Sequence, residues 1–168
     1  MEDLDKVEFI FSPFDFISER SAKKLDLLTN AQKKEITDRV KEYVLDAVKS
    51  DLSDQISSVT GRQFVKLSDE YAKVKKAAGK GTKANLIFDG DLVDSIRIRK
   101  GTDNRLKLTV LNSQMGKADG HNNHTGDSPL PRRAFIPNVQ DDETFRPAIR
   151  REIKNIVESA LNDLEEDG

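Results

Sequence analysis

Cysteine is absent from the sequence, and its absence removes several classes of function at once. Disulfide bonds, thiolate nucleophiles and cysteine-based zinc sites are all excluded. No apolar run approaches the roughly 20 residues that span a bilayer. The acidic start MEDLDKVEF also lacks the basic and apolar segments of a signal peptide. We therefore expect a soluble protein of the cytoplasm, or of a particle that is assembled there.

Apolar residues are scarce as well. Hydrophobic side chains make up 36% of the 168 residues and charged ones 35%, which are below and above the usual balance of a globular domain. The length allows one ordinary domain, and the composition predicts a thin core that neighbouring molecules help to complete. The net charge of −2 provides no overall attraction to nucleic acid.

Phenylalanine is concentrated near the N-terminus, where four of the eight rings precede residue 17. The alternation of Val7, Phe9 and Phe11 predicts one short strand. Residues 1–28 are expected to form an extension around this strand, and they are too few to bury the rings alone. We therefore expect these rings at a subunit interface: Phe9, Phe11, Phe14 and Phe16.

Two long helices are predicted in residues 29–168, which we expect to form a single domain. Thr29 and Gln32 have the spacing of a capping box. An apolar stripe with the helical period follows as far as Ile56, and Gly61 is the expected stop. The last helix is predicted to begin at about Thr144, with a proline in its first turn, where the missing N–H costs nothing.

Shorter elements are predicted between these helices. Residues 68–79 have the pattern of a short helix, a helical turn follows Gly90, and the alternation in residues 95–111 predicts a hairpin. Residues 112–140 show no period, and a loop of that length in a compact domain is usually functional or disordered. The predicted fold is α+β: a long N-terminal helix and a C-terminal helix packed on a small antiparallel sheet, with a long extended loop before the last helix.

The long loop contains both histidines of the chain, His121 and His124, between Asp119 and Asp127. A zinc site needs three or four ligands in a tetrahedral arrangement, and no regular element is expected here to orient them. The motifs of other catalytic sites are also missing from the sequence. It contains no G-x-S-x-G turn, and AAGKGTKAN does not have the spacing of a phosphate-binding loop. We therefore expect no enzyme activity, no metal and no cofactor.

The segment from Arg62 to Lys83 is basic, with seven positive charges against two negative ones, a local charge of +5. A nucleic-acid-binding face is one interpretation. Aromatic side chains are few in this segment and no recognition motif is present. A solvated helix face, or a patch that meets an acidic partner, is therefore favoured.

The end of the long loop, PLPRRAFIPN, has the composition of an interaction segment. Its prolines hold the backbone extended and lower the entropy lost on docking, while its arginines and its Phe-Ile pair are typical interface anchors. The alternative is that Phe135 and Ile136 cover the domain's own core. The loop residues expected at an interface are His121, His124, Pro131, Arg132, Arg133, Phe135 and Ile136.

Several short motifs follow one another in a characteristic order. The first group of motifs consists of Gly, Phe, Leu-Ser, Tyr and Lys. The second consists of Asn-Leu and Gly-x-Leu-x-x-Ser-Ile. The third is a histidine loop with Pro-x-Arg-x-Phe, which precedes the last helix. The residues concerned are Gly61, Phe64, Leu67, Ser68, Tyr71, Lys75, Asn85, Leu86, Gly90, Leu92, Ser95, Ile96, His121 or His124, Gly126, Pro131, Arg133 and Phe135. In this order the chain resembles the phage virion-morphogenesis or tail-completion family.

The resemblance implies a structural virion protein and no enzyme. Such a protein is a ring-forming subunit, expected here as a homo-hexamer, at the head-proximal end of a phage tail. The expected partners are the tail terminator or tail tube and the neck or connector proteins, with genomic DNA passing the channel without specific recognition and with no membrane. The expected location is the virion, assembled in the host cytoplasm. The alternative is a metal-dependent hydrolase or a nucleic-acid-binding accessory protein, using the histidine loop or the basic segment.

Overall fold

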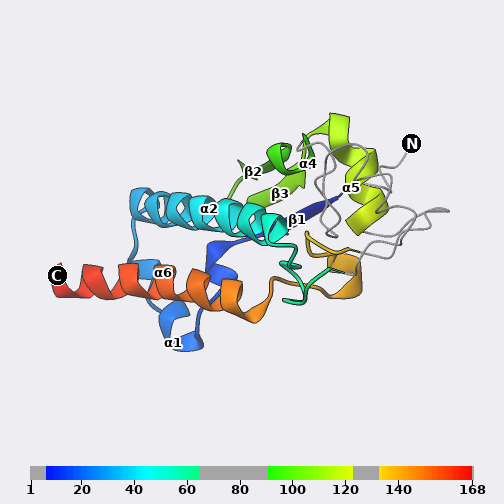
Figure 1. The fold of residues 1–168 in the computed structure, drawn as a ribbon. Helices are drawn as coiled ribbons and strands as arrows, with labels where there is room; N and C mark the ends of the chain where they lie inside the picture. The colour runs from blue at the N-terminus through cyan, green and yellow to red at the C-terminus, as the bar shows by residue number, and fades with distance from the viewer. Residues whose placement is uncertain (1–6, 65–90, 123–132, 168) are drawn as a thin grey trace, which may run out of the picture.

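A computed structural model describes residues 7–64, 91–122 and 133–167, and it confirms the predicted α+β class. Two long helices, α2 (Asn30–Ser53) and α6 (Pro147–Asp167), pack against each other, with a small sheet beside them (Figure 1). The expected helix at residues 68–79 lies outside the described residues.

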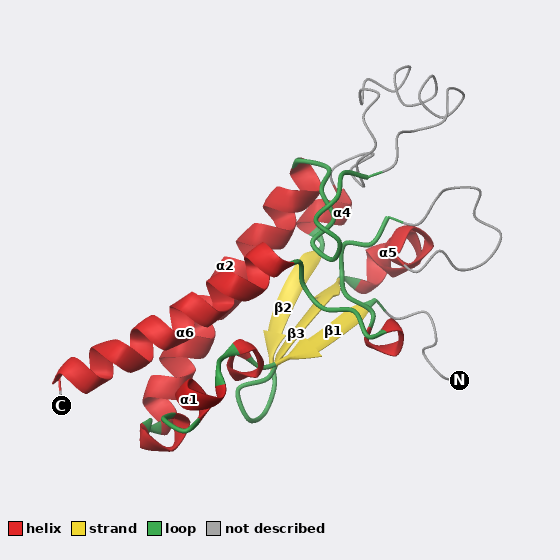
Figure 2. Cartoon of the chain, turned by 90° about the horizontal axis from the view of Figure 1, so that it is seen from below, coloured by secondary structure: helices red, strands yellow, loops and turns green. Residues whose placement is uncertain are grey.

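The sheet has three antiparallel strands in the order β1-β3-β2 (Figure 2). Strands β2 (Ile96–Lys100) and β3 (Leu106–Val110) form the predicted hairpin, whose turn places Asp103 and Asn104 at positive φ. The predicted N-terminal strand is confirmed as β1 (Glu8–Phe11), which pairs with the other side of β3. Because β3 is central, β1 and β2 form the two edges of the sheet that residues 7–64, 91–122 and 133–167 build.

The first long helix begins where the sequence predicts, and the last begins at Pro147, three residues after the expected start at Thr144. The Thr29 hydroxyl accepts a hydrogen bond from the Gln32 backbone at 3.1 Å, and the Gln32 side chain accepts one from Thr29 at 2.8 Å. Proline at position 147 is the first residue of α6. The buried side chains of both helices recur at helical spacing and share one core with the strands. The main ones are Ile36, Val40, Val44, Val48, Leu52, Ile149, Ile153, Val157 and Leu161.

The end of the first long helix differs from the prediction. Helix α2 stops at Ser53, several residues before Gly61, because Gln55 adopts a left-handed φ of 64°. The Ile56 amide then donates to the Asp51 carbonyl at 2.8 Å and Gln55 to Leu52 at 3.2 Å, the pattern of a Schellman cap. Ile56 leaves the helix and bridges to Gln63 instead. The apolar stripe therefore continues past the point where the backbone turns.

The predicted loop at residues 112–140 also differs in part. It contains the short turn Asn112–Gln114, the helix α5 (Met115–Asn122) and a further turn at Val139–Asp141. Another short helix, α4 (Asp91–Asp94), precedes β2, where the sequence predicts a helical turn. The two glycines of α5 weaken the helical pattern, which explains why its sequence shows no apolar period.

The N-terminal segment is tied to the last helix. After β1 the chain forms the turn η1 (Pro13–Phe16), the helix α1 (Glu19–Ala22) and the turn η2 (Leu25–Leu27). The hydroxyls of Ser21 and Ser18 donate to the Glu158 carboxylate at 2.8 and 3.1 Å. These bonds, the one from Ser21 first, hold the pKa of Glu158 below its ordinary value. The segment expected as an extension thus lies against α6.

A cluster of aromatic rings lies where these parts meet. The rings of Phe9 and Phe11 each contact Phe145 edge-to-face, with centroids 5.2 Å apart in both cases. The ring of Phe16 also belongs to the cluster, and its centroid lies 6.2 Å from that of Phe11. Such pairs add about 0.5–1.5 kcal/mol each beyond the area they bury. Four rings therefore join β1 and η1 to the segment just before α6.

We predict that Phe145→Ala destabilises the protein by about 3–5 kcal/mol, because it empties the centre of this cluster. Urea denaturation followed by circular dichroism measures the effect. Leu27→Ala is the control, since Leu27 is 76% exposed and its loss is expected to change the free energy of unfolding by less than about 0.5 kcal/mol. Equal effects in the two variants would contradict the assigned role of the cluster.

Candidate interaction surface

The predicted interface residues of the long loop do not form an exposed group in the described part of the chain. His121 lies within α5, and its side chain is outside the described part, as are His124, Pro131 and Arg132. Arg133, Phe135 and Ile136 are described and are buried in this chain's own interior. These three therefore cannot act as exposed anchors, which corrects that part of the prediction. The alternative, that Phe135 and Ile136 cover the domain's own core, is the one that the structure shows.

The physical reason for this burial is a clamp formed by Asn122. Its Oδ1 accepts hydrogen bonds from the backbone amides of Phe135 at 2.7 Å and Ile136 at 2.8 Å. Its Nδ2 donates to the Ile136 carbonyl at 3.0 Å. One buried side chain thus satisfies three backbone groups that would otherwise lie in the interior without water. The clamp holds the extended segment inward, and the sequence pattern contains no signal for it.

A second buried polar cluster links the two long helices. The Asp51 carboxylate accepts two hydrogen bonds from the Arg146 guanidinium, both at 2.9 Å, and a third from the Ser58 hydroxyl at 2.9 Å. The Arg146 amide donates to the Ser58 carbonyl at 2.7 Å. The hydrogen bond to Asp51 is the main cause that raises the pKa of Arg146. This two-point contact between a guanidinium and a carboxylate suits a structural link between the two segments.

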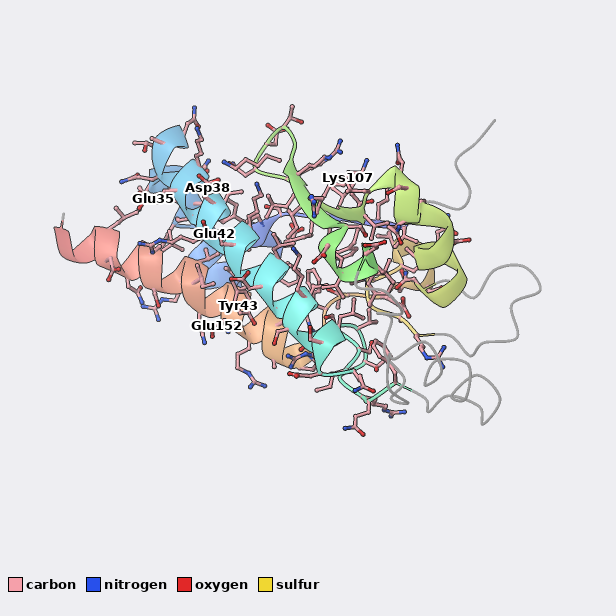
Figure 3. All side chains as sticks on the ribbon, turned by 45° about the horizontal axis from the view of Figure 1, so that its top comes forward. Glu35, Asp38, Glu42, Tyr43, Lys107 and Glu152 are labelled. Carbon is pink, nitrogen blue, oxygen red and sulfur yellow. The ribbon has the colours of Figure 1, made fainter. Side chains whose placement is uncertain are left out.

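Tyr43 lies next to this cluster. Figure 3 shows its side chain on α2 beside Glu152 on α6. Burial first, and then the negative charge of Glu152, raise the pKa of the Tyr43 hydroxyl above its ordinary value. The hydroxyl therefore stays protonated at neutral pH and is no candidate for a base.

An exposed groove lies beside β1, which is an edge strand of the sheet within the described part of the chain. It has a volume of about 440 Å³. The rings of the aromatic cluster form part of its lining, and two apolar side chains beside them are open to solvent, Ile10 at 50% and Val139 at 60% exposure. The residues that line it are Phe9, Ile10, Phe11, Asp15, Phe16, Val139, Asp142, Glu143 and Thr144.

The groove has an apolar base and an acidic rim. Asp15 accepts a hydrogen bond from the Ser12 amide at 2.9 Å, and Glu143 accepts one from the Asn138 amide at 3.0 Å. Asp142 is exposed and adopts a left-handed conformation at the end of the Val139–Asp141 turn. The two hydrogen bonds hold the Asp15 and Glu143 carboxylates beside the exposed apolar side chains. The rim therefore favours a partner with positive charge.

Three of the four N-terminal phenylalanines that were expected at an interface line this groove: Phe9, Phe11 and Phe16. Phe9 and Phe11 are themselves buried against Phe145 of the same chain, so they cannot act as exposed anchors, which corrects the expectation for these two rings. Their role is to shape the groove from within. Ile10 and Val139 were not predicted. For Ile10 a signal existed, because an isoleucine between two inward-facing residues of a strand must point to the opposite face.

Metal centres and membrane spans are not found among the described residues. In residues 7–64, 91–122 and 133–167, no group of three or more histidine, aspartate or glutamate residues is arranged to hold a metal ion. Among the described helices, none has the length and apolar character needed to cross a membrane.

We predict that Asn122→Ala frees the segment at residues 134–136. Removing the clamp leaves three buried backbone groups unsatisfied, so the free energy of unfolding should fall by about 2–3 kcal/mol. Hydrogen exchange should show faster exchange at the amides of Phe135 and Ile136. Asn155→Ala, at an exposed position of α6, is the matched control. Unchanged exchange at residues 135 and 136 would show that the clamp does not hold this segment.

The chain was also compared with known proteins. No family model matches it. No curated protein matches it. No solved structure matches it.

Proposed function

We propose that this chain is a structural subunit of a tailed-phage virion, which forms a ring at the head-proximal end of the tail and joins the tail to the neck or connector. The observation that carries the proposal is the groove along β1, an apolar surface with a charged rim beside a strand that pairs on one side only among the described residues. The order of motifs that resembles the tail-completion family supports the same proposal. Its partners are further copies of the chain and the adjoining tail and neck proteins.

The groove has the properties of a docking site for protein. An edge strand presents unpaired backbone N–H and C=O groups to a neighbour. Ile10 and Val139 beside it lose solvent contact when a partner docks, and each fully buried side chain of this kind contributes about 1.5–3 kcal/mol. The aromatic rings beneath keep the groove in shape, so little entropy is lost on binding. The surface therefore suits permanent assembly.

Hydrogen bonds in the interior support this function, because they hold the segments next to the groove. The Asn122 clamp and the Asp51–Arg146 link both lie in the segments that lead to the Val139–Asp141 turn and to α6. A subunit that joins two larger particles transmits force through its contacts, and hydrogen-bonded segments resist that displacement. The acidic rim then selects among neighbours by charge.

We predict that Ile10→Lys and Val139→Lys each reduce the joining of heads to tails by more than about ten-fold, since each removes apolar contact worth over 1.4 kcal/mol. Heads and tails assembled without this chain would be mixed with the purified variant, and joined particles counted by electron microscopy. Both positions are exposed, so folding should be nearly unchanged.

Leu27→Lys is the matched control, because it places the same charge at an exposed apolar position on the η2 turn, outside the groove. It should join heads to tails as the natural chain does. Normal joining by Ile10→Lys and Val139→Lys together would overturn the proposed role of the groove.

A further inference from the structure

The two edges of the sheet carry charges of opposite sign. On β2, the side chains that alternate with buried Ile96 and Ile98 are those of Arg97 and Arg99, and both are exposed. Lys100 lies on the same face of the strand as Ile96 and Ile98, where it forms an ion pair with Asp38 of α2. On the β1 side the charged groups are carboxylates, on the strand and on the rim of the groove. They belong to Glu8, Asp15, Asp142 and Glu143. One edge is therefore basic and the other is acidic.

Charges on edge strands normally prevent a sheet from pairing with another sheet. In this chain, whether the charges repel or attract depends on which two edges meet. Two β1 edges would bring two acidic rims together, and two β2 edges would bring Arg97 and Arg99 against their own copies, both of which are unfavourable. A β1 edge against a β2 edge brings opposite charges together instead. The opposite charges of the two edges thus disfavour pairing between two β1 edges or two β2 edges, and they permit pairing between a β1 edge and a β2 edge.

We propose that β1 of one copy pairs with β2 of a second copy, so that the sheet continues from subunit to subunit. The proposal rests on the proposed function and names the partner of the groove: another copy of this chain, offering its Ile96–Lys100 edge. Such a contact joins different surfaces of the two copies. It is therefore heterologous, the kind of contact that closes into a ring when the rotation per subunit allows.

The geometry of the strands allows this continuation. Both β1 and β2 run antiparallel to β3, so they run in the same direction as each other. A second copy added in the same orientation therefore pairs its β1 with β2 in parallel. Phe9 and Phe11 alternate inward as Ile96 and Ile98 do, so the helix-covered face stays continuous across the boundary.

The opposite face of the sheet then gains specific contacts. Glu8 and Ile10 of one copy come beside Arg97 and Arg99 of the next. Within one copy, the Glu8 carboxylate already forms an ion pair with Lys107 at 2.9 Å, and Figure 3 shows Lys107 projecting from the sheet. The arginine stems can cover the exposed part of Ile10 while their charged ends reach the carboxylates. The groove is thereby filled without burying an unpaired charge.

Cysteine cross-linking tests this pairing directly, because the natural chain contains no cysteine. Full-length Ile10→Cys would be mixed with either Arg97→Cys or Arg99→Cys and oxidised mildly. Positions on one face of a strand recur about every 7 Å. One of the two arginine positions should therefore lie within the roughly 4.4–6.8 Å between Cα atoms that a disulfide requires.

The expected result is a disulfide-linked heterodimer that exceeds each homodimer by roughly ten-fold, a preference of about 1.4 kcal/mol. Mass spectrometry would identify the linkage. Leu27→Cys in place of Ile10→Cys is the control for random collision and should give no preferred heterodimer. Adding Arg97→Glu to the Arg99→Cys partner, or Arg99→Glu to the Arg97→Cys partner, should lower the heterodimer yield.

Two results would overturn the pairing. One is a predominance of homodimers linked through residue 10 or through residue 97 or 99, which would show that like edges meet. The other is the absence of any preferred cross-link while Ile10→Lys still prevents head-to-tail joining, which would show that the groove holds a different protein. In that second case the proposed function stands and only the identity of the partner fails.

Discussion

The packing of the N-terminal strand against Phe145 is the contact on which the rest of the arrangement depends. Strand β1 pairs with β3 from a distant part of the sequence, and closing so long a loop has an entropic cost. The edge-to-face contacts of Phe9 and Phe11 with Phe145 offset part of that cost. The same ring stands just before α6. One aromatic residue thus holds together both walls of the groove, β1 on one side and residues 139–144 on the other.

Buried hydrogen bonds stabilise segments of the fold that the small apolar core does not hold by itself. Asn122 satisfies three backbone groups of the Phe135–Ile136 segment, and Asp51 joins the end of α2 to the beginning of α6 through Arg146. Buried polar groups stabilise a fold when every partner is present and weaken it when one is missing. Their geometry is therefore demanding. That demand fixes the positions of residues 135 and 136 and of the start of α6, which an apolar contact alone would leave free to slide.

The sequence was sufficient to predict the elements whose patterns are local. The capping box at Thr29, the alternation in β2 and β3, and the proline at the start of α6 each depend on neighbouring residues only. The clamp by Asn122 and the pair Asp51–Arg146 depend on residues that meet only after folding, and no spacing in the chain marks them. Arg133 and Phe135 were misjudged for the same reason: arginine and phenylalanine suit an interface and an interior equally, and only the clamp decides between them.

The packing beneath the groove bears on the angle between neighbouring copies in the proposed ring. A heterologous contact closes into a ring only if each copy turns by a fixed fraction of a full circle, and otherwise it grows as a filament. A flexible edge could not set that angle. In this chain the β1 edge rests on the Phe145 ring, and the far wall of the groove is fixed by the Asn138 cap and its bond to Glu143. In the proposed pairing, strand twist would add a rotation of constant sign at each boundary between copies. A well-packed interior behind the edge strand would therefore allow that pairing to close into a ring.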